Sequence, residues 1–100
     1  LKPNGDAVML IKPQFEAGPE NIGKHGIVKD PAVHKMVLEM ITDFAVQAGY
    51  SVLGLDFSPI KGGEGNIEFL IHLRNVGDDA KFDSPTSVED ILKAAHSTLD

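Results

Sequence analysis

A lysine at the end of an apolar run is the first feature of the sequence that suggests chemistry. Residues 7–11 are apolar, and Lys12 and Pro13 follow them directly. In an open α/β sheet, ligands bind beyond the carboxyl ends of the strands, so Lys12 can face a reaction site there. Lysines are usually exposed, however, and a solvated side chain at a strand end is the alternative that position alone leaves open.

Glu68 is the second candidate, because an acid is out of place at the start of an otherwise apolar strand over residues 67–73. A buried carboxylate without a partner is strongly unfavourable, so Glu68 should pair with a cation or line a cleft. If its strand runs antiparallel to the first, its start lies beside the end of the first, and Lys12 and Glu68 can meet. The residues alone leave open whether they form a structural ion pair or an active-site pair.

Residues 13–30 are rich in glycine and charge and predict a long irregular segment beside Lys12. Long loops in compact domains are often functional. The basic residues Lys24, His25 and Lys29 could contact phosphate groups. A solvated loop with incidental charge is equally consistent with this composition.

The elements that would position these residues follow from local patterns. Residues 6–12 predict a short strand covered on both faces, because the run is so apolar. Asp30 and Pro31 predict the start of a helix, and Gly49 predicts its end. Between them, apolar side chains recur at helical spacing, and we assign this stripe to the core: Val33, Met36, Val37, Met40, Ile41, Phe44 and Ala48, with His34, Lys35, Glu39 and Asp43 on the opposite face.

The second half of the chain predicts a hairpin and a final helix. Residues 50–57 and 67–73 read as strands, and the short connection between them, rich in turn-forming residues, makes them antiparallel. Thr86 and Glu89 have the spacing of a capping box. An apolar stripe follows it: Val88, Ile91, Leu92, Ala95 and Leu99. The predicted order is β-α-β-β-α, an α/β fold whose last strand is antiparallel.

Composition limits the class of protein. One hundred residues make one small domain or a piece of a larger one, and a chain that begins with Leu1 suggests that an upstream part is missing. The net charge of −6 has the wrong sign for a free-standing nucleic-acid binder. No apolar run is long enough for a membrane span. We expect no metal site, because the four histidines lack ligand spacing and there is no cysteine. The absence of cysteine is also compatible with a cytosolic protein.

Three segments together resemble a known family: KPQFEAG (12–18), GKHGIVKDPAVH (23–34) and SPIKGGEGNIEFLIHLR (58–74). They are similar to the carboxyl-terminal half of the TlyA-type family, often named hemolysin A. The catalytic domain of that family resembles FtsJ-type ribosomal RNA 2′-O-methyltransferases.

The resemblance implies a Rossmann-like methyltransferase that uses S-adenosylmethionine. In such a sheet the last strand is antiparallel and lies between the two strands before it. Residues 1–100 would be the carboxyl-terminal half of the domain. The cofactor-binding half and an S4-like RNA-binding domain would lie upstream, so the cofactor-binding residues stay unassigned and we expect no S-adenosylmethionine binding by the chain alone.

The family's chemistry also implies roles for the two candidates. Its tetrad is Lys-Asp-Lys-Glu, in which Lys12 matches the second lysine and Glu68 the glutamate. A nearby carboxylate favours the charged form of a lysine. We therefore favour Lys12 as the group that positions the ribose hydroxyl and stabilises negative charge, with the role of base as the weaker alternative. Glu68 would hold the lysines in place, and Lys24 and Lys29 would contact the RNA backbone.

The implied partners are ribosomal RNA or ribosomal subunits and the chain's own upstream half, in the cytoplasm. The alternative is a hemolysin-like cytolysin or a non-catalytic interaction module. Neither predicted helix has the strongly cationic polar face expected of a membrane-surface binder.

Overall fold

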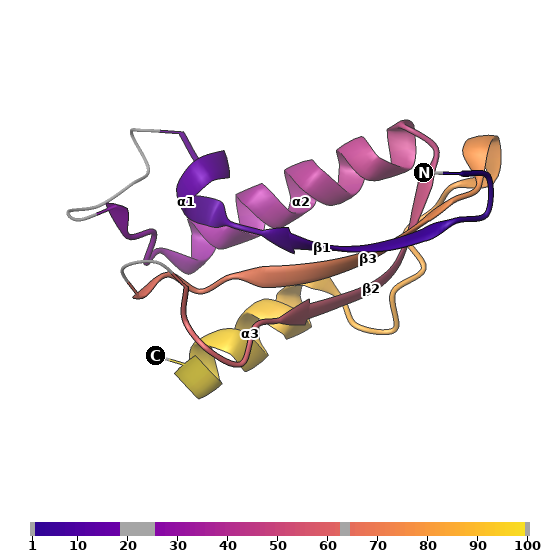
Figure 1. Ribbon diagram of the computed structural model, residues 1–100. Helices are drawn as coiled ribbons and strands as arrows, with labels where there is room; N and C mark the ends of the chain where they lie inside the picture. The colour runs from indigo at the N-terminus through magenta and orange to yellow at the C-terminus, as the bar shows by residue number, and fades with distance from the viewer. Residues whose placement is uncertain (1, 19–25, 63–64, 100) are drawn as a thin grey trace.

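The computed structural model describes residues 2–18, 26–62 and 65–99. The elements follow one another in this order: β1 (Asp6–Ile11), α1 (Pro13–Glu16), α2 (Pro31–Gln47), β2 (Tyr50–Phe57), β3 (Phe69–Asn75), the 3₁₀ turn η4 (Gly77–Asp79) and α3 (Val88–Leu99), as Figure 1 shows. The segment expected to be irregular therefore contains one short helix, α1. The third strand begins and ends two residues later than predicted.

The three strands form one sheet in the order β1-β3-β2. β3 pairs antiparallel with both neighbours, so β1 and β2 are parallel to each other and β3 lies between them. Phe69 of β3 is opposite Ile11 of β1 and Phe57 of β2. The carboxyl ends of β1 and β2 and the start of β3 therefore share one rim, and the predicted antiparallel last strand is confirmed.

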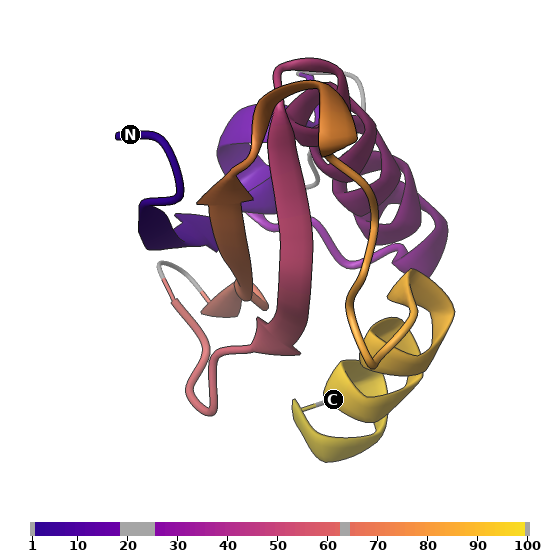
Figure 2. The same cartoon turned by 90° about the vertical axis from the view of Figure 1, so that its right-hand side faces the viewer.

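One face of the sheet is buried and the other is open. Along β3, Phe69, Ile71 and Leu73 are buried, whereas the alternate residue Arg74 is exposed. This alternation is what the two-residue period of a strand dictates when helices cover one side alone. In Figure 2, α2 and α3 lie on the same side of the sheet.

The prediction that the first strand is covered on both faces is wrong for this chain. Val8, Met9 and Leu10 are exposed, with exposed fractions of 68%, 55% and 47%, and only Ile11 of β1 is buried. β1 is an edge strand, because among the described residues nothing pairs along its outer side.

The ends of α2 are as predicted, but its buried face is not. Asp30 caps the helix, since its Oδ1 accepts a hydrogen bond from the Ala32 amide at 2.9 Å, and Gly49 follows the last turn with a φ of 93°. The buried side chains are His34, Val37, Leu38, Thr42 and Ala45. Met36, Met40 and Phe44 are exposed, so assigning the whole Met and Phe stripe to the core was wrong. The reason is tertiary: α2 turns the face with Val37 and Leu38 toward β2 and α3, which leaves the other apolar side chains uncovered.

α3 buries the predicted stripe, but its capping residue is one position later than expected. Val88, Ile91, Leu92 and Ala95 are buried, and Leu99 packs against the core. Ser87 is the capping residue, since its Oγ accepts a hydrogen bond from the Asp90 amide at 3.1 Å. The predicted capping box at Thr86 is wrong, because Thr86 is held in the preceding turn by the hydroxyl of Ser84.

Candidate active site

Lys12 stands at the rim where β1 ends. Its backbone is still extended, with φ −113° and ψ 96°, and its carbonyl accepts a hydrogen bond from the Phe15 amide at 2.9 Å, which starts α1. Because Ile11 is opposite Phe69, one further step along the antiparallel register brings Lys12 opposite Glu68. Opposite residues of paired strands point to the same face and lie close together. The structure thus places Lys12 and Glu68 at the same rim of the sheet.

Glu68 is buried, with 7% of its surface exposed. Its backbone carbonyl accepts a hydrogen bond from the Ser58 amide at 2.8 Å, which ties the start of β3 to the end of β2. Its Oε2 accepts a hydrogen bond from Nε2 of Gln14 at 2.9 Å. A Cβ at Gly62 would overlap the Glu68 carboxylate, so the absence of a side chain there leaves room for this buried acid.

The ammonium of Lys12 rests on an aromatic ring instead of on the carboxylate. Within the described residues, no ion pair joins Lys12 to Glu68. The Nζ atom lies 5.9 Å from the centre of the Phe15 ring, and Phe15 is 75% exposed. A cation–π contact at such an exposed site contributes about 0.5–1 kcal/mol. The lysine side chain is therefore held only weakly in this position.

Gln14 is a site residue that sequence reasoning missed. Its amide nitrogen donates to Glu68, and its Oε1 is buried without a hydrogen-bond partner, the one such side-chain atom in the described part of the chain. No local pattern indicated a direction for this side chain, because the segment after Lys12 was predicted to be irregular. α1 supplies that direction: Pro13 is fixed at its first position, and Gln14 follows it in the first turn.

Asn66 is a second missed residue, and it fastens the loops beside Glu68. It is buried, its Oδ1 accepts from the Val28 amide at 2.8 Å, and its Nδ2 donates to the Gly26 carbonyl at 2.9 Å. The segment before α2 is thereby tied to the loop between β2 and β3. Lys29, which follows directly, is exposed beside this junction. Lys24 and His25 lie outside the described residues.

A pocket of about 450 Å³ opens next to this junction, lined by Ile27, Val28, Lys29, His34, Lys61, Gly65, Ile67 and His96. His34 is buried there, although the sequence placed it on the polar face of its helix. Its Nε2 donates to the Val28 carbonyl at 2.9 Å, so its Nδ1, if the ring is neutral, accepts from Nε2 of His96 at 2.8 Å. The histidine pair joins α2, α3 and the segment before α2, and Lys29 and Lys61 line the same pocket.

The described residues do not fit a site for S-adenosylmethionine. In dinucleotide-type folds a glycine-rich turn joins a strand to a helix and cradles the nucleotide. Here β1 leads through Lys12 and Pro13 into α1, and β2 and β3 are joined by the loop that seats Glu68. No cofactor-binding residue is assigned to this part of the protein.

Neither a metal cluster nor a membrane-crossing helix is found in the part of the chain that the structure describes. No group of three or more His, Asp or Glu side chains lies close enough together there to hold a metal ion. None of the described helices combines the length and the apolar character that crossing a bilayer requires.

Comparison with known proteins adds a family to this geometry. A family model described as "FtsJ-like methyltransferase" matches residues 2–75. "Putative rRNA methyltransferase YqxC" of Bacillus subtilis (strain 168) is 46% identical over 99% of this chain and 36% of its own length. "16S/23S rRNA (cytidine-2'-O)-methyltransferase TlyA" of Mycobacterium tuberculosis is 34% identical over 94% of this chain and 34% of its own length.

Solved structures show the same similarity. A structure titled "Putative hemolysin from Streptococcus thermophilus" superposes with a TM-score of 0.90 at 53% identity, over 98% of this chain and 35% of that one. A protein named "Hemolysin A" from Brachyspira hyodysenteriae is 40% identical over 65% of this chain and 27% of its own length. The chain spans about a third of the length of the first two relatives above.

Proposed function

We propose, because this chain belongs to the FtsJ-like methyltransferase family, that it forms the carboxyl-terminal part of an S-adenosylmethionine-dependent ribosomal RNA 2′-O-methyltransferase. One observation carries the proposal. Lys12 and Glu68 are far apart in the sequence, yet both lie at the one rim where β1 and β2 end. The names of the relatives, which include rRNA cytidine-2′-O-methyltransferases, support the same reaction.

The catalytic domain would be completed by residues outside this chain. The relatives are about three times as long, and β1 carries exposed apolar side chains along an unpaired edge. A further strand beside β1 would cover that edge, as expected if residues 1–100 are the carboxyl-terminal half of a Rossmann-like sheet. The methyl donor would be bound by that other half, so titration calorimetry of the chain alone should detect no binding of S-adenosylmethionine.

The reaction makes specific demands on the rim. S-adenosylmethionine would supply an electrophilic methyl group: the ribose 2′-oxygen would bond to it as the methyl–sulfur bond breaks, the sulfonium would leave as a neutral thioether, and the hydroxyl proton would pass to water. Negative charge develops on the attacking oxygen. A positioned ammonium group stabilises such charge best where water is excluded. Lys12, in contact with the exposed Phe15 ring and not with a carboxylate, can turn to orient the hydroxyl and stabilise this oxygen.

Glu68 would act on the lysine and not on the substrate. It is buried behind Gln14 and Gly62, so a nucleoside would not reach it directly. A buried carboxylate beside the rim would attract the ammonium group of Lys12 and limit its orientations. Lys29, exposed at the same end of the molecule, and Lys24 would contact the RNA backbone.

The test is methyl transfer by the full-length protein to ribosomal subunits. Lys12→Met and Glu68→Gln should each lower the rate about 10²–10⁴-fold, the usual contribution of a positioned acid–base or charged group. Circular dichroism should show both variants folded. Lys93→Met, which changes an exposed lysine on α3, is the matched control and should retain full activity. Normal methylation by both site variants would overturn the proposal.

A membrane-active or non-catalytic module is the alternative, and the name "Hemolysin A" of one relative is what favours it. It predicts that the protein binds lipid vesicles and that Lys12 and Glu68 are dispensable. The alternative would be favoured over the enzyme if the wild-type protein co-sediments with lipid vesicles and if Lys12→Met and Glu68→Gln bind the vesicles as well as wild type does.

A further inference from the structure

We infer that Gln14 is a positioning residue that links Lys12 to Glu68 through its side-chain amide. The inference rests on the proposed function and revises how the carboxylate acts within it: Glu68 would hold the lysine through the amide, without a direct ion pair. Two observations carry it, the hydrogen bond from Gln14 to the buried carboxylate and the buried, unpartnered oxygen at the other side of the same amide.

The orientation of the amide follows from the chemistry of its partner. An ionised carboxylate can only accept hydrogen bonds, so the amide must turn its nitrogen toward Oε2 of Glu68. The amide oxygen is then directed elsewhere. That oxygen is buried and accepts no hydrogen bond from the residues that the structure describes. An acceptor without a partner is unfavourable inside a protein, so the Gln14 oxygen calls for a donor.

The donor that fits this oxygen is the ammonium of Lys12. Lys12 is opposite Glu68 by one step of register beyond the last strand pair, and Gln14 is bonded to that same Glu68. The ammonium has three donors and contacts a ring that is itself 75% exposed. Leaving the ring for the amide oxygen would replace a weak contact by a charge-assisted hydrogen bond.

The resulting arrangement is a chain of three groups: carboxylate, amide, ammonium. The amide nitrogen donates to Glu68, and the amide oxygen accepts from Lys12. Gly62 completes the arrangement, because a side chain there would displace the carboxylate. An amide in this position fixes the direction of the ammonium and leaves its remaining donors to the ribose hydroxyl.

The first arm of the test is kinetic and uses the full-length protein. Gln14→Met keeps the size of the side chain but removes both hydrogen bonds. We expect kcat for methylation of ribosomal subunits to fall about 10–100-fold with KM for the subunits nearly unchanged, the pattern of a group that acts on the reacting atoms through another. In a Lys12→Met background, Gln14→Met should cause no further loss. If the fold-loss in kcat of the double variant instead equals the product of the two single-variant losses, Gln14 acts independently of Lys12, and the proposed link is overturned.

The second arm does not depend on activity. In the full-length protein, the side-chain amide resonance of Gln14 should shift in Lys12→Met and in Glu68→Gln, but not in the control Lys93→Met. A shift with Glu68→Gln alone would overturn the lysine link. If the wild-type protein methylates no RNA, the proposed function fails, while these resonances still decide whether the amide joins the two groups.

Discussion

Two side-chain amides, the partly buried Gln14 and the buried Asn66, organise the rim around the acid Glu68. An amide offers a donor and an acceptor without a net charge, so it can be buried at less cost than an ionised group. Asn66 uses both functions on the backbone of residues 26–28, whereas Gln14 uses one on Glu68. The loops at the rim are thus held in part by neutral side chains.

A charged cluster at the opposite end of the sheet gives a prediction on pH. Asp6 accepts hydrogen bonds from Nε and Nη2 of Arg74 at 2.7 and 3.0 Å and from Nε2 of His72 at 2.9 Å. The guanidinium of Arg74 and then the His72 ring lower the pKa of Asp6 from 3.8 to about 2. Because the folded-state pKa lies below the unfolded one, Asp6 stabilises the fold above pH 3.8, and this contribution is lost as the pH falls toward 2.

We therefore expect Asp6→Asn to lower the free energy of unfolding at pH 6 by a modest amount, since the cluster is partly exposed. The difference from wild type should shrink between pH 4 and pH 2. Urea unfolding at a series of pH values measures it. A difference that stays constant down to pH 2 would show that the carboxylate's charge does not matter here.

Among the secondary-structure elements, α2 depends on signals at both of its ends. Asp30 accepts the hydrogen bond that starts the helix, and Gly49 adopts the positive φ that ends it, in close contact with the backbone of Gly77. The two ends determine which residues belong to the helix that packs on the sheet. His34 is one of these residues, and its ring packs edge-on against Phe69 at a centroid distance of 5.6 Å.

Asp30→Ala should lower the free energy of unfolding by about 1 kcal/mol, because the first turn loses its capping acceptor. Asp30→Asn should keep most of the stability, since asparagine is an equally good cap. Asp43→Ala, which changes an exposed acid within the same helix, serves as the control. Equal losses in Asp30→Ala and Asp30→Asn would argue against capping as the cause.

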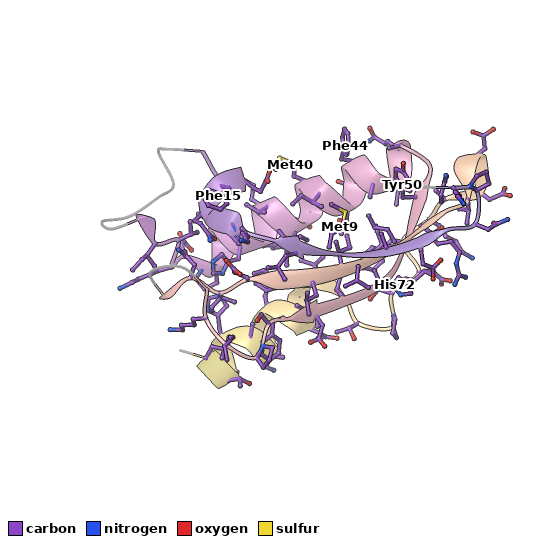
Figure 3. All side chains as sticks on the ribbon, in the orientation of Figure 1. Met9, Phe15, Met40, Phe44, Tyr50 and His72 are labelled. Carbon is purple, nitrogen blue, oxygen red and sulfur yellow. The ribbon has the colours of Figure 1, made fainter. Side chains whose placement is uncertain are left out.

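Of the elements that the structure describes, two leave three large apolar side chains each exposed to solvent. They are Val8, Met9 and Leu10 on β1 and Met36, Met40 and Phe44 on α2. Figure 3 shows Met40 and Phe44 pointing away from the sheet. Exposed apolar side chains of this size and number on one small domain mark candidate interaction surfaces.

The isolated chain should therefore associate with itself, and Phe44→Lys should raise its monomer fraction in sedimentation experiments. In the full-length protein the same change should instead cost about 1.5–3 kcal/mol of stability, the contribution of burying one large apolar side chain. Ile60→Lys, which changes an exposed apolar residue in the loop after β2, is the control. If Phe44→Lys leaves the full-length protein as stable as wild type, this face stays open to solvent.

Local sequence patterns were sufficient to predict the three strands and the two long helices in order, both ends of α2, the antiparallel hairpin and the choice of Lys12 and Glu68 as candidates, but not α1. Each of these depends on residues close together in the chain: a cap, a turn, an apolar period or a charge at the end of a run. The roles of the two candidates in catalysis stay predictions.

Tertiary packing was needed to establish which face of α2 is buried and that β1 is exposed. It was also needed to establish that Gln14, Asn66 and His34 make hydrogen bonds around the candidate site. Their partners lie 54, 38 and 62 residues away, at Glu68, Val28 and His96. A periodic pattern shows that a helix has an apolar side, but not which neighbour covers it, because burial depends on elements that the chain brings together only when it folds.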